Sequence, residues 1–517
     1  MLKQHYEPHL TPVDEALFRQ LVPADHYLRR LKSVIDFTPC RALVADCYSA
    51  AHGRGALDPV LLIKLLILRF HYGLSDERVI EQAQVNLAYR FFLDLSWDEA
   101  LPEPSLLSQF RTRLGDQKIE AIFQEILRQA RAAGLVKDRL RLMDATHLIA
   151  DIAVPATLGL VAEIRDRLLQ AAESFAPDEV AAHRQTAIEV RQASADLPNE
   201  ARLLRRVEHL RALVTWAAEW QARLEFGAPP VSDEIYDAFM LRLAQARKIL
   251  QDREPPKAPD QLRALSDTDA RRGKHGDFYD GYLADVMMDA DSELITAIEV
   301  LPANADEAAN AQVLLASEET AHGVDIENLS LDAIAYNGPV LHALSDAPEG
   351  PQVTVWTPPK DAPPRSPELF QPRDFTLNAA GDEVTCPNGE KTRTRYPDKK
   401  GHGEHYQFST RQCRDCPLRA QCQTPGNRQG RRVRMNFYTA QYAAAQQRAT
   451  TDEYKKIRKE HPAIERKLNE LVRWHDGRRV RFRGRLRVRA QYLLLAVVVN
   501  CKRIVRLLAP APAAQPA

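Results

Sequence analysis

The sequence predicts an α/β protein in which a mixed sheet flanked by helices is joined to an all-α N-terminal domain, a helical insertion and a small cysteine-containing insert. Residues 1–137 and 159–254 have apolar residues at helical spacing, whereas residues 138–158 and 271–360 contain short apolar runs and turn residues typical of strands. In addition, 517 residues exceed the size of one hydrophobic core, so several domains are expected.

The N-terminal domain, residues 1–137, contains clear helix-start signals. Asp58-Pro59 is a good N-cap and first-turn pair for the apolar run that follows it. Gly73 ends that helix, and Ser75 can cap the next one. These signals predict that the region is helical throughout.

Two more helices are predicted further along this domain. Ser105 can cap a helix over residues 106–114, and another helix follows over residues 117–133. A short helix, a turn and a helix that carries Gln109 and Arg111 are compatible with a helix-turn-helix reader of DNA. They are equally compatible with plain bundle helices.

The strands of the sheet come from two separate stretches. Residues 138–158 should supply a first buried strand, and residues 271–360 a hairpin over 282–300, a helix over 306–320 and further strands. Between these stretches, residues 159–270 are rich in Ala, Leu, Glu and Arg and are broken by prolines. We interpret them as a helical insertion, a structural or dimerising spacer.

Three acidic residues far apart in the sequence are the candidate catalytic groups: Asp144, Asp332 and Glu465. Asp144 and Asp332 each end a short apolar run, so each should lie at a strand end, and Glu465 lies at the edge of the apolar stripe of a basic helix. Such carboxylates suit a two-metal phosphodiester site, because Mg²⁺ prefers oxygen ligands and two ions can hold the attacking and leaving oxygens. Most acidic residues are solvated surface charges, and helical phase alone does not separate Glu465 from Glu460 and Glu470.

Four of the seven cysteines form a second metal-type pattern, C-x26-C-x2-C-x5-C, within residues 361–440. In a reducing compartment, four thiolates of this kind predict a closed, structural Zn²⁺ site that contributes to folding and not to chemistry. The alternatives are reduced free cysteines, or a site in which His402 or His405 replaces the first cysteine. The four candidate ligands are Cys386, Cys413, Cys416 and Cys422.

Positive charge is concentrated toward the C-terminal end. Residues 386–508 contain 30 Lys or Arg against 10 Asp or Glu, although the whole chain is neutral. This asymmetry predicts a nucleic-acid partner, with a solvated surface of salt bridges as the alternative. Residues 441–508 should hold the catalytic helix, a stretch in which Arg alternates with apolar residues, and a core helix over 492–499; residues 509–517 should be a disordered tail. The arginines expected to hold phosphates are Arg473, Arg479, Arg481 and Arg483.

The sequence shows no sign of a membrane segment or of export. No stretch of 18 uninterrupted apolar residues is present, and the first residues lack the apolar core of a signal peptide. We therefore expect a cytoplasmic protein, associated with the nucleoid when it is bound to DNA, in which disulfides are disfavoured.

In this order and spacing, these motifs resemble those of bacterial insertion-sequence transposases of the DDE class, in the branch with a four-cysteine insert before the catalytic Glu. The resemblance covers most of the chain from about residue 56 to residue 508. Its clearest segments are residues 58–62, 91–93, 142–146, 269–271, 279–282, 289–292, 302–304, 331–336, 413–422, 464–465 and 500–503.

The resemblance implies a ribonuclease H-like catalytic domain interrupted by insertions, with Asp144, Asp332 and Glu465 as the ligands of two Mg²⁺ or Mn²⁺ ions. It also implies cleavage at the ends of an insertion sequence and strand transfer into target DNA. Double-stranded DNA, as terminal inverted repeats and target, would be the partner, bound by a homodimer or a larger assembly. The chain departs from the family where Arg458 and His461 replace the usual Tyr and Arg before the Glu.

Two other functions fit the same sequence. One is a catalytically silent, transposase-derived protein that only binds DNA, and a metal-dependent nicking assay would separate it from the enzyme. The other is an RNA-processing nuclease of similar fold, which would prefer an RNA duplex in competition with DNA.

Overall fold

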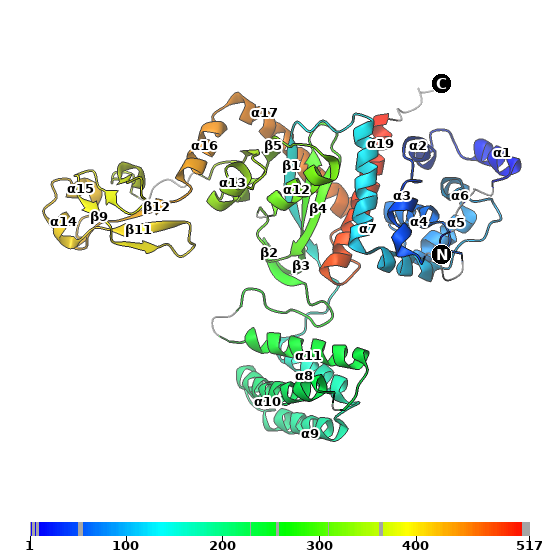
Figure 1. Ribbon diagram of the computed structural model, residues 1–517, viewed down its shortest axis with the longest axis horizontal. Coiled ribbons are helices and arrows are strands. Elements are labelled where there is room, and N and C mark those ends of the chain that lie inside the picture. Colours follow the sequence, from blue (N-terminus) through cyan, green and yellow to red (C-terminus); the bar gives the residue numbers. More distant parts are fainter. Residues whose placement is uncertain are drawn as a thin grey trace.

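The computed structural model describes residues 2, 6, 10–49, 55–227, 229–254, 258–308, 310–360 and 366–508. Their elements form a mixed α/β structure in which a curled sheet lies beside the helical N-terminal region (Figure 1). The tail predicted for residues 509–517 lies outside the described residues.

Six strands form the central sheet in the order β2-β3-β1-β5-β6, with β4 also paired to β3. β3 is antiparallel to β1, β2 and β4, whereas β5 is parallel to both β1 and β6. The hairpin expected over residues 282–300 is confirmed as β3 and β4. The strands are β1 Arg141–Ile149, β2 Arg271–His275, β3 Asp277–Asp289, β4 Ile295–Pro302, β5 Asn328–Ser330 and β6 Thr354–Trp356.

Each face of this sheet packs into its own hydrophobic core. On one face Leu142 and Val286 lie in a core shared with helices α18 and α19. On the other, Met143 and Met287 pack with α12 and α13. The alternation follows from the two-residue period of a strand. The four helices are α12 Ala311–His322, α13 Gly338–Ser345, α18 Pro462–Asn469 and α19 Arg485–Leu508.

The N-terminal region is helical, as predicted, from α1 to α7. Asp58 and Ser75 cap α4 and α5 by accepting hydrogen bonds from first-turn N–H groups at 3.0 and 3.1 Å. Ser105 does not cap a helix: α7 starts at Pro104 and absorbs the expected break in a kink at Gly115, whose φ of +60° suits glycine. The elements are α1 Pro12–Leu21, α2 Tyr27–Val34, α3 Cys40–Leu43, η1 Ala45–Cys47, α4 Pro59–His71, α5 Asp76–Val85, α6 Leu87–Leu93 and α7 Pro104–Ala132.

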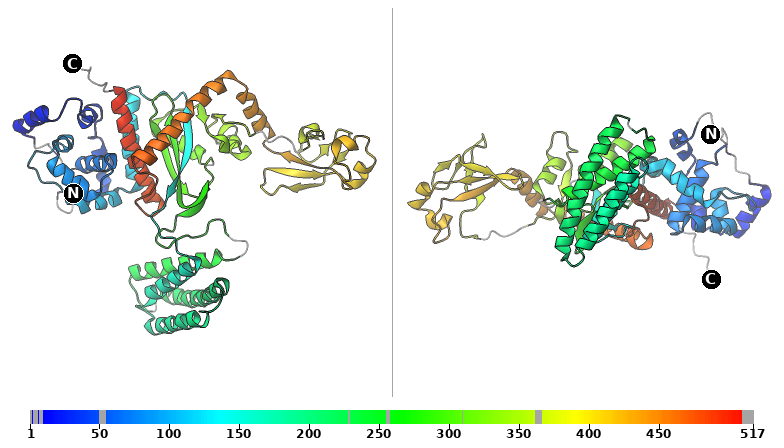
Figure 2. Two further views of the ribbon diagram at one scale, coloured as in Figure 1. Left: turned by 180° about the vertical axis from the view of Figure 1, so that it is seen from behind. Right: turned by 90° about the horizontal axis from the view of Figure 1, so that it is seen from below.

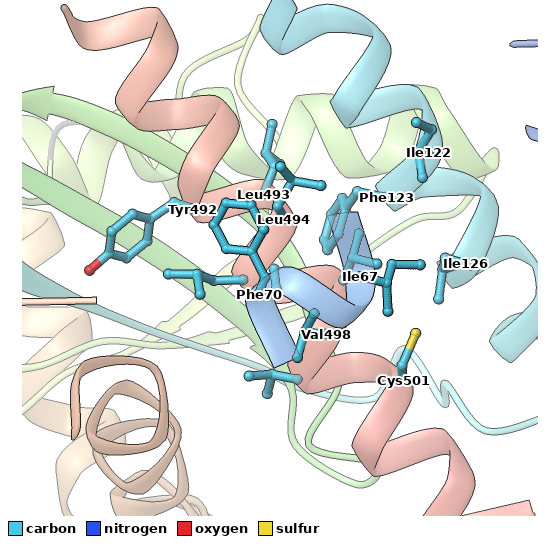
Figure 3. Close-up of a cluster of buried hydrophobic side chains, with 14 of the residues drawn as sticks. Ile67, Phe70, Ile122, Phe123, Ile126, Tyr492, Leu493, Leu494, Val498 and Cys501 are labelled. Carbon is cyan, nitrogen blue, oxygen red and sulfur yellow. The ribbon is translucent and has the colours of Figure 1, made fainter. Parts of the chain in front are cut away.

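Helix α19 joins the N-terminal region to the sheet. It extends well beyond the core run expected over residues 492–499. Its buried Val498 and Cys501 lie in the same cluster as Ile67 of α4 and Ile126 of α7 (Figure 3). The N-terminal helices and the C-terminal helix therefore share one core.

The segment between β1 and β2 forms a separate bundle of four helices below the sheet (Figure 1). Its apolar residues form their own core, which includes Leu168, Leu213 and Phe239. The left view of Figure 2 also shows this bundle projecting away from the sheet. The helices are α8 Thr157–Ala172, α9 Pro177–Ala193, α10 Asn199–Glu225 and α11 Asp233–Gln251.

The cysteine-containing segment lies at the far end of the molecule from the N-terminal helices (Figures 1 and 2). Its described residues form two small three-stranded sheets, two short α-helices and the 3-10 turn η3 (Pro372–Asp374), and α16 and α17 lead from it back to the central sheet. Among the described residues, no helix is long and apolar enough to cross a membrane. The elements are β7 Thr376–Leu377, β8 Val384–Thr385, β9 Lys391–Thr392, β10 Arg395–Pro397, β11 Gly403–Gln407, β12 Arg432–Asn436, α14 Thr410–Arg414, α15 Arg419–Cys422, α16 Thr439–Ala449 and α17 Asp452–Glu460.

Candidate active site

The pairing of β1 with β5 brings Asp144 and Asp332 together. Leu142 pairs with Ser330 in parallel register, and each aspartate follows its strand residue by two positions. Because side chains alternate between faces, both aspartates lie on the same face, on neighbouring chain segments that are about 4.8 Å apart where they pair.

The two aspartates occupy different places along their strands. Asp332 lies two residues beyond the end of β5, and its Oδ1 accepts a hydrogen bond from the N–H of Ile334 at 2.9 Å. Asp144 was expected at a strand end but lies in the middle of β1. The strand continues because residues as far as Ile149 pair with β3, so the polar residues after Asp144 are held in the sheet.

Helix α18 carries Glu465 to this face. The helix packs on β1, and Ile464 and Leu468 are buried while Glu465 beside them is exposed. The pKa of Asp144 is raised to about 7, chiefly by burial and then by the charges of Asp332 and Glu465. The charges of the other two predicted carboxylates therefore reach Asp144.

Asp144 has little to neutralise it. Its hydrogen bond with the backbone is local, because the N–H of Ala145 donates to Asp144 Oδ1 at 2.8 Å. Burial raises the pKa of Asp144, and that hydrogen bond lowers it. The charged neighbours that act on it are carboxylates, which raise the pKa because like charges disfavour ionisation. A concentration of negative charge at a half-buried position is the electrostatic character of a cation site.

Two further carboxylates, which are not among the three predicted catalytic residues, lie near this group. Glu307 follows β4 in a loop, and burial and then Asp332 raise its pKa. Asp285 on β3 is fully buried, and neither of its oxygens has a hydrogen-bond partner among the described residues. Burial raises the pKa of Asp285 well above its usual range, and Glu307 adds to this. The one sequence signal for Asp285 was a charge within an apolar strand.

Arg458 and His461, the residues that depart from the family pattern, both hold β5 in place. Arg458 Nη1 donates to the carbonyl of Leu331 at 2.8 Å and to Ser330 Oγ at 3.2 Å. The buried His461 ring lies 3.1 Å from the same Ser330 Oγ. Burial lowers the pKa of His461 to about 4, so the ring is neutral near pH 7. These two side chains fix the strand end from which Asp332 projects.

Comparison with protein families places this geometry in context. Residues 16–113 match a family described as a transposase domain (DUF772), and residues 385–505 match a family described as a transposase DDE domain. The chain belongs to the insertion-sequence transposases of the DDE class. The second match includes Glu465 but begins after Asp144 and Asp332. Comparisons of this transposase with curated proteins and with solved structures gave no match.

A basic segment of the transposase lies along β1 beyond Asp144. The N–H of Ile149 donates to the carbonyl of Arg478 at 2.8 Å, and the N–H of Val480 donates to the carbonyl of Ile149 at 3.0 Å. Arg478 Nη1 donates to Thr146 Oγ1 at 3.2 Å and to the carbonyl of His147. The segment that follows the Glu465 helix is thus anchored two residues from Asp144.

The arginines expected to bind DNA differ in their availability. Arg473 and Arg479 are exposed, as is Gln109 on α7. Arg111 instead donates to both carboxylate oxygens of Asp76, at 2.8 and 2.6 Å, and its side chain is mostly buried. Its guanidinium joins α7 to α5 of the transposase. The pair of donors that was expected to contact DNA bases is therefore already bound to Asp76.

The arginines that alternate with apolar residues after the Glu465 helix do not all lie on one basic surface. Helix α19 begins at Arg485, so the two-residue period ends there. Arg489 is mostly buried and forms ion pairs with Asp116, Glu120 and Glu299. Arg481 and Arg483 lie before the helix, and each donates to a backbone carbonyl, of Leu74 at 3.3 Å and of Asp151 at 2.9 Å. Much of this charge serves to tie elements together.

The four candidate cysteines of the transposase lie near one another. Burial raises the pKa of Cys422, and the charges of Cys413, Cys386 and Cys416 raise it further. The N–H of Arg431 donates to Cys413 Sγ at 3.3 Å. His402 instead makes an edge-to-face contact with Tyr438, and it is Cys386 that lies near the other three cysteines.

The described residues contain no group of three or more His, Cys, Asp or Glu side chains placed closely enough to hold a metal ion. The carboxylates and the four cysteines are nevertheless close enough for their charges to shift the pKa of Asp144 and of Cys422. Binding of an ion would draw the side chains of each group closer together. The donor chemistry fits: carboxylate oxygens that repel one another suit a hard divalent cation, and four thiols suit Zn²⁺.

Proposed function

We propose that this transposase cleaves DNA at the ends of an insertion sequence and joins the freed strands to target DNA. The observation that carries the proposal is the parallel register of β1 with β5, which sets Asp144 and Asp332 side by side beneath the α18 helix that bears Glu465. The electrostatic coupling of these three carboxylates supports it.

A ribonuclease H-like core is the fold that we propose for the catalytic part. An antiparallel β3–β4 hairpin beside β1, followed by a helix and then two strands parallel to β1, supports this assignment. The catalytic segments would then be residues 138–158, 271–360 and 441–508. Residues 1–137 would form the DNA-binding domain, 159–270 the helical insertion and 361–440 the zinc insert.

Asp144, Asp332 and Glu465 would hold two Mg²⁺ or Mn²⁺ ions. Such ions, when bound, lower the pKa of a ligated water and neutralise charge on the reacting phosphate. Arg458 would position Asp332 through the end of β5, and Arg478 would position the strand that carries Asp144. The residues of the chain thereby orient the ligands before substrate arrives.

DNA would lie across this face of the sheet. The exposed Arg473 and Arg479, close in sequence to the anchor at Arg478, would contact phosphates, and Gln109 would contact the element end. Arg481 and Arg483 would contribute less, because part of their donor capacity is used within the protein. Because strand transfer must bring two element ends together, we propose that two or more copies act in the DNA complex.

The decisive experiment is strand cleavage of labelled DNA that spans the end of the chain's own element, with Mg²⁺. We expect Asp144→Asn, Asp332→Asn and Glu465→Gln each to abolish cleavage while leaving DNA binding nearly unchanged, because each removes a charged ligand without changing side-chain size. Glu460→Gln is the matched control, since Glu460 is on the neighbouring helix and pairs with Arg139.

The outcomes separate the candidate functions. Wild-type cleavage by any of the three variants would remove that residue from the site. A wild-type protein that binds element ends but cuts none of them with Mg²⁺ or Mn²⁺ would instead indicate the catalytically silent DNA-binding protein.

A further inference from the structure

The small sheet β10–β11–β12 of the cysteine-containing segment has one covered face. Tyr406 on β11 and Val433 on β12 lie opposite each other and are buried in the core of this segment. One position along each strand, the side chains point to the other side, because successive residues of a strand alternate between faces. Tyr396, His405 and Arg434 form a row across the three strands there, and we call this side the outer face.

The outer face presents polar groups to solvent. Tyr396 is 55% exposed, Arg434 is exposed and His405 is half-buried. Arg432 is two residues from Arg434 on β12, so it belongs to the same face, and it is also exposed. Within the described part of the chain, the Tyr396 hydroxyl and the Arg432 guanidinium have no hydrogen-bond partner. Both groups are therefore available to a ligand.

A turn that carries two lysines adjoins this face where β10 leads into β11. The N–H of Asp398 donates to the carbonyl of Gly403 at 3.0 Å, and the N–H of Gly401 donates to the carbonyl of Asp398 at 3.1 Å. Asp398 Oδ1 also accepts a hydrogen bond from the N–H of Lys400 at 2.5 Å. Lys399 and Lys400 are thus exposed on a turn whose backbone is held in place.

Positive charge exceeds negative charge around the outer face. Residues 385–436 contain 12 Lys or Arg against 4 Asp or Glu. Two of these acidic residues are at the sheet and are already paired: Asp398 accepts from Arg434 Nε at 2.8 Å, and Glu404 pairs with Arg395 at 3.0 Å. The cations of the outer face and its turn that form no ion pair with any described residue are Lys399, Lys400 and Arg432.

This surface suits the backbone of duplex DNA. Lys and Arg side chains bind phosphate oxygens, and a Tyr hydroxyl can donate to them as well. The core of a protein–protein interface is depleted in charged residues, whereas cations predominate here. Charge complementarity therefore favours a nucleic-acid occupant over a protein partner.

The place of the segment in the molecule indicates which part of the DNA it would meet. The segment lies at one end, the N-terminal helices lie at the other, and the central sheet lies between them (Figures 1 and 2). If the N-terminal region holds the element end, as proposed above, the DNA that continues past the cut runs toward the cysteine-containing segment.

We propose that the outer face of β10–β12 and its lysine turn bind the phosphate backbone of the flanking duplex, on the other side of the cut from the element end. This inference rests on the proposed cleavage function. Because the contacts go to phosphates, they do not depend on the sequence of the flank.

Binding of the full chain to labelled DNA without divalent metal tests this surface separately from catalysis. The probes are element ends with no flank and with a flank of about two helical turns, roughly 70 Å. The outer-face variant combines Lys399→Gln, Lys400→Gln and Arg432→Gln.

We expect the variant to lose the contribution of the flank alone. On the flanked probe, its slope of log affinity against log salt should be shallower than that of the wild type by about 2.7, which is roughly 0.9 for each of three contacts. Raising the salt about fourfold should therefore weaken wild-type binding about 40-fold more than variant binding. The unflanked probe should bind both proteins equally.

A matched control removes the same charge from the same segment. Arg411 and Arg414 on α14 and Arg428 in the loop before β12 are exposed and lie outside the outer face. None of the three forms an ion pair with a residue that the structure describes. The combination of Arg411→Gln, Arg414→Gln and Arg428→Gln should keep the wild-type slope on the flanked probe.

The results that would overturn the proposal are distinct from a failure of the proposed function. Equal slopes of wild type and the outer-face variant on the flanked probe would overturn it, as would an equal loss of binding to the unflanked probe. Weaker binding of a target duplex, with the flank bound as before, would also overturn it and assign the surface to target DNA. A wild-type protein that binds no element end would overturn the proposed function as well.

Discussion

Asp144 carries a charge that its neighbours make unfavourable. Burial, and then the charges of Asp332 and Glu465, raise its pKa to about 7, so the ionised form costs free energy in the folded chain. Proteins retain such a cost where the charge has a function, because strongly perturbed carboxylates are concentrated at active sites. The residue that destabilises the metal-free protein is thus also one that we propose as a ligand of a cation.

Asp144→Asn is therefore expected to stabilise the metal-free protein at pH 8. A carboxyl with a raised pKa in the folded state binds more protons there than in the unfolded state, so its contribution falls as pH rises. The difference in melting temperature between variant and wild type should be largest above pH 7 and should shrink toward the usual pKa of 3.8. Melting curves from pH 5 to pH 8 measure it, with Asp196→Asn as an exposed control.

Divalent metal should reverse that order. Mg²⁺ or Mn²⁺ that binds the folded state alone raises stability by about 2.7 kcal/mol at a hundred times its dissociation constant. We expect the melting temperature of the wild type to rise with Mn²⁺ and that of Asp144→Asn to stay constant. An equal rise in both proteins would place the ion elsewhere.

At the level of elements, the segment after the Glu465 helix is the part of the protein that we propose to hold DNA. Removing Arg473 and Arg479 together should weaken binding to all DNA sequences about equally, because phosphate contacts carry little base information. The slope of log affinity against log salt should become shallower by roughly 0.9 for each phosphate that the variant no longer binds. Arg191→Ala, in the helical insertion, is the control, and an unchanged slope in the double variant would mean that this segment does not contact DNA.

The cysteine-containing segment is small and has a small hydrophobic core. Its buried apolar residues are few, so a metal ion is the expected source of its stability. We predict about one tightly bound Zn²⁺ per chain, absent from Cys416→Ser but kept in Cys47→Ser, a half-buried cysteine elsewhere. Elemental analysis of protein purified without chelator measures it, and protein free of zinc would contradict the prediction.

The elements with strong local signals were predictable from the sequence. Capping at Asp58 and Ser75 and the hairpin of β3 with β4 depend on neighbours along the chain. The position at which β1 ends could not be predicted, because the strand continues beyond Asp144 only through its pairing with β3, which is far along the sequence. The internal role of Arg111 was hidden for the same reason, since Asp76 lies on another helix.

The site was only partly predictable on the same grounds. Acidic residues at the ends of apolar runs indicated Asp144 and Asp332, but their register depends on two residues of parallel pairing. Glu307 and Asp285 join the group through folding alone, in a loop and within an apolar strand. Sequence patterns identify which residues carry charge, whereas their convergence is a property of the tertiary structure.

At the scale of the whole molecule, the helical insertion enters and leaves the sheet at neighbouring points. Ile149 at the end of β1 and Arg271 at the start of β2 both pair with Gly281, so they lie about 10 Å apart, two strand spacings. The apolar residues between them form a core of their own.

Replacing residues 157–265 by a short Gly/Ser linker should therefore leave the rest of the protein folded. We expect the shortened chain to remain monodisperse, with a melting temperature within a few degrees of the wild type. The reason is that the deletion removes the entire core of the bundle and leaves the cores of the sheet covered. Size-exclusion chromatography and thermal melting test this. Aggregation of the shortened chain would show that the bundle stabilises the sheet.

The core shared by α4, α7 and α19 has a consequence for the time at which the protein matures. A chain leaving the ribosome can pack its first helices only provisionally, because Val498 and Cys501, which complete their core, are translated about 400 residues after Ile67 and Phe70. An interrupted nascent chain would thus expose this apolar surface. The N-terminal region, which we expect to bind DNA, would therefore fold fully only in molecules whose catalytic residues had already been translated.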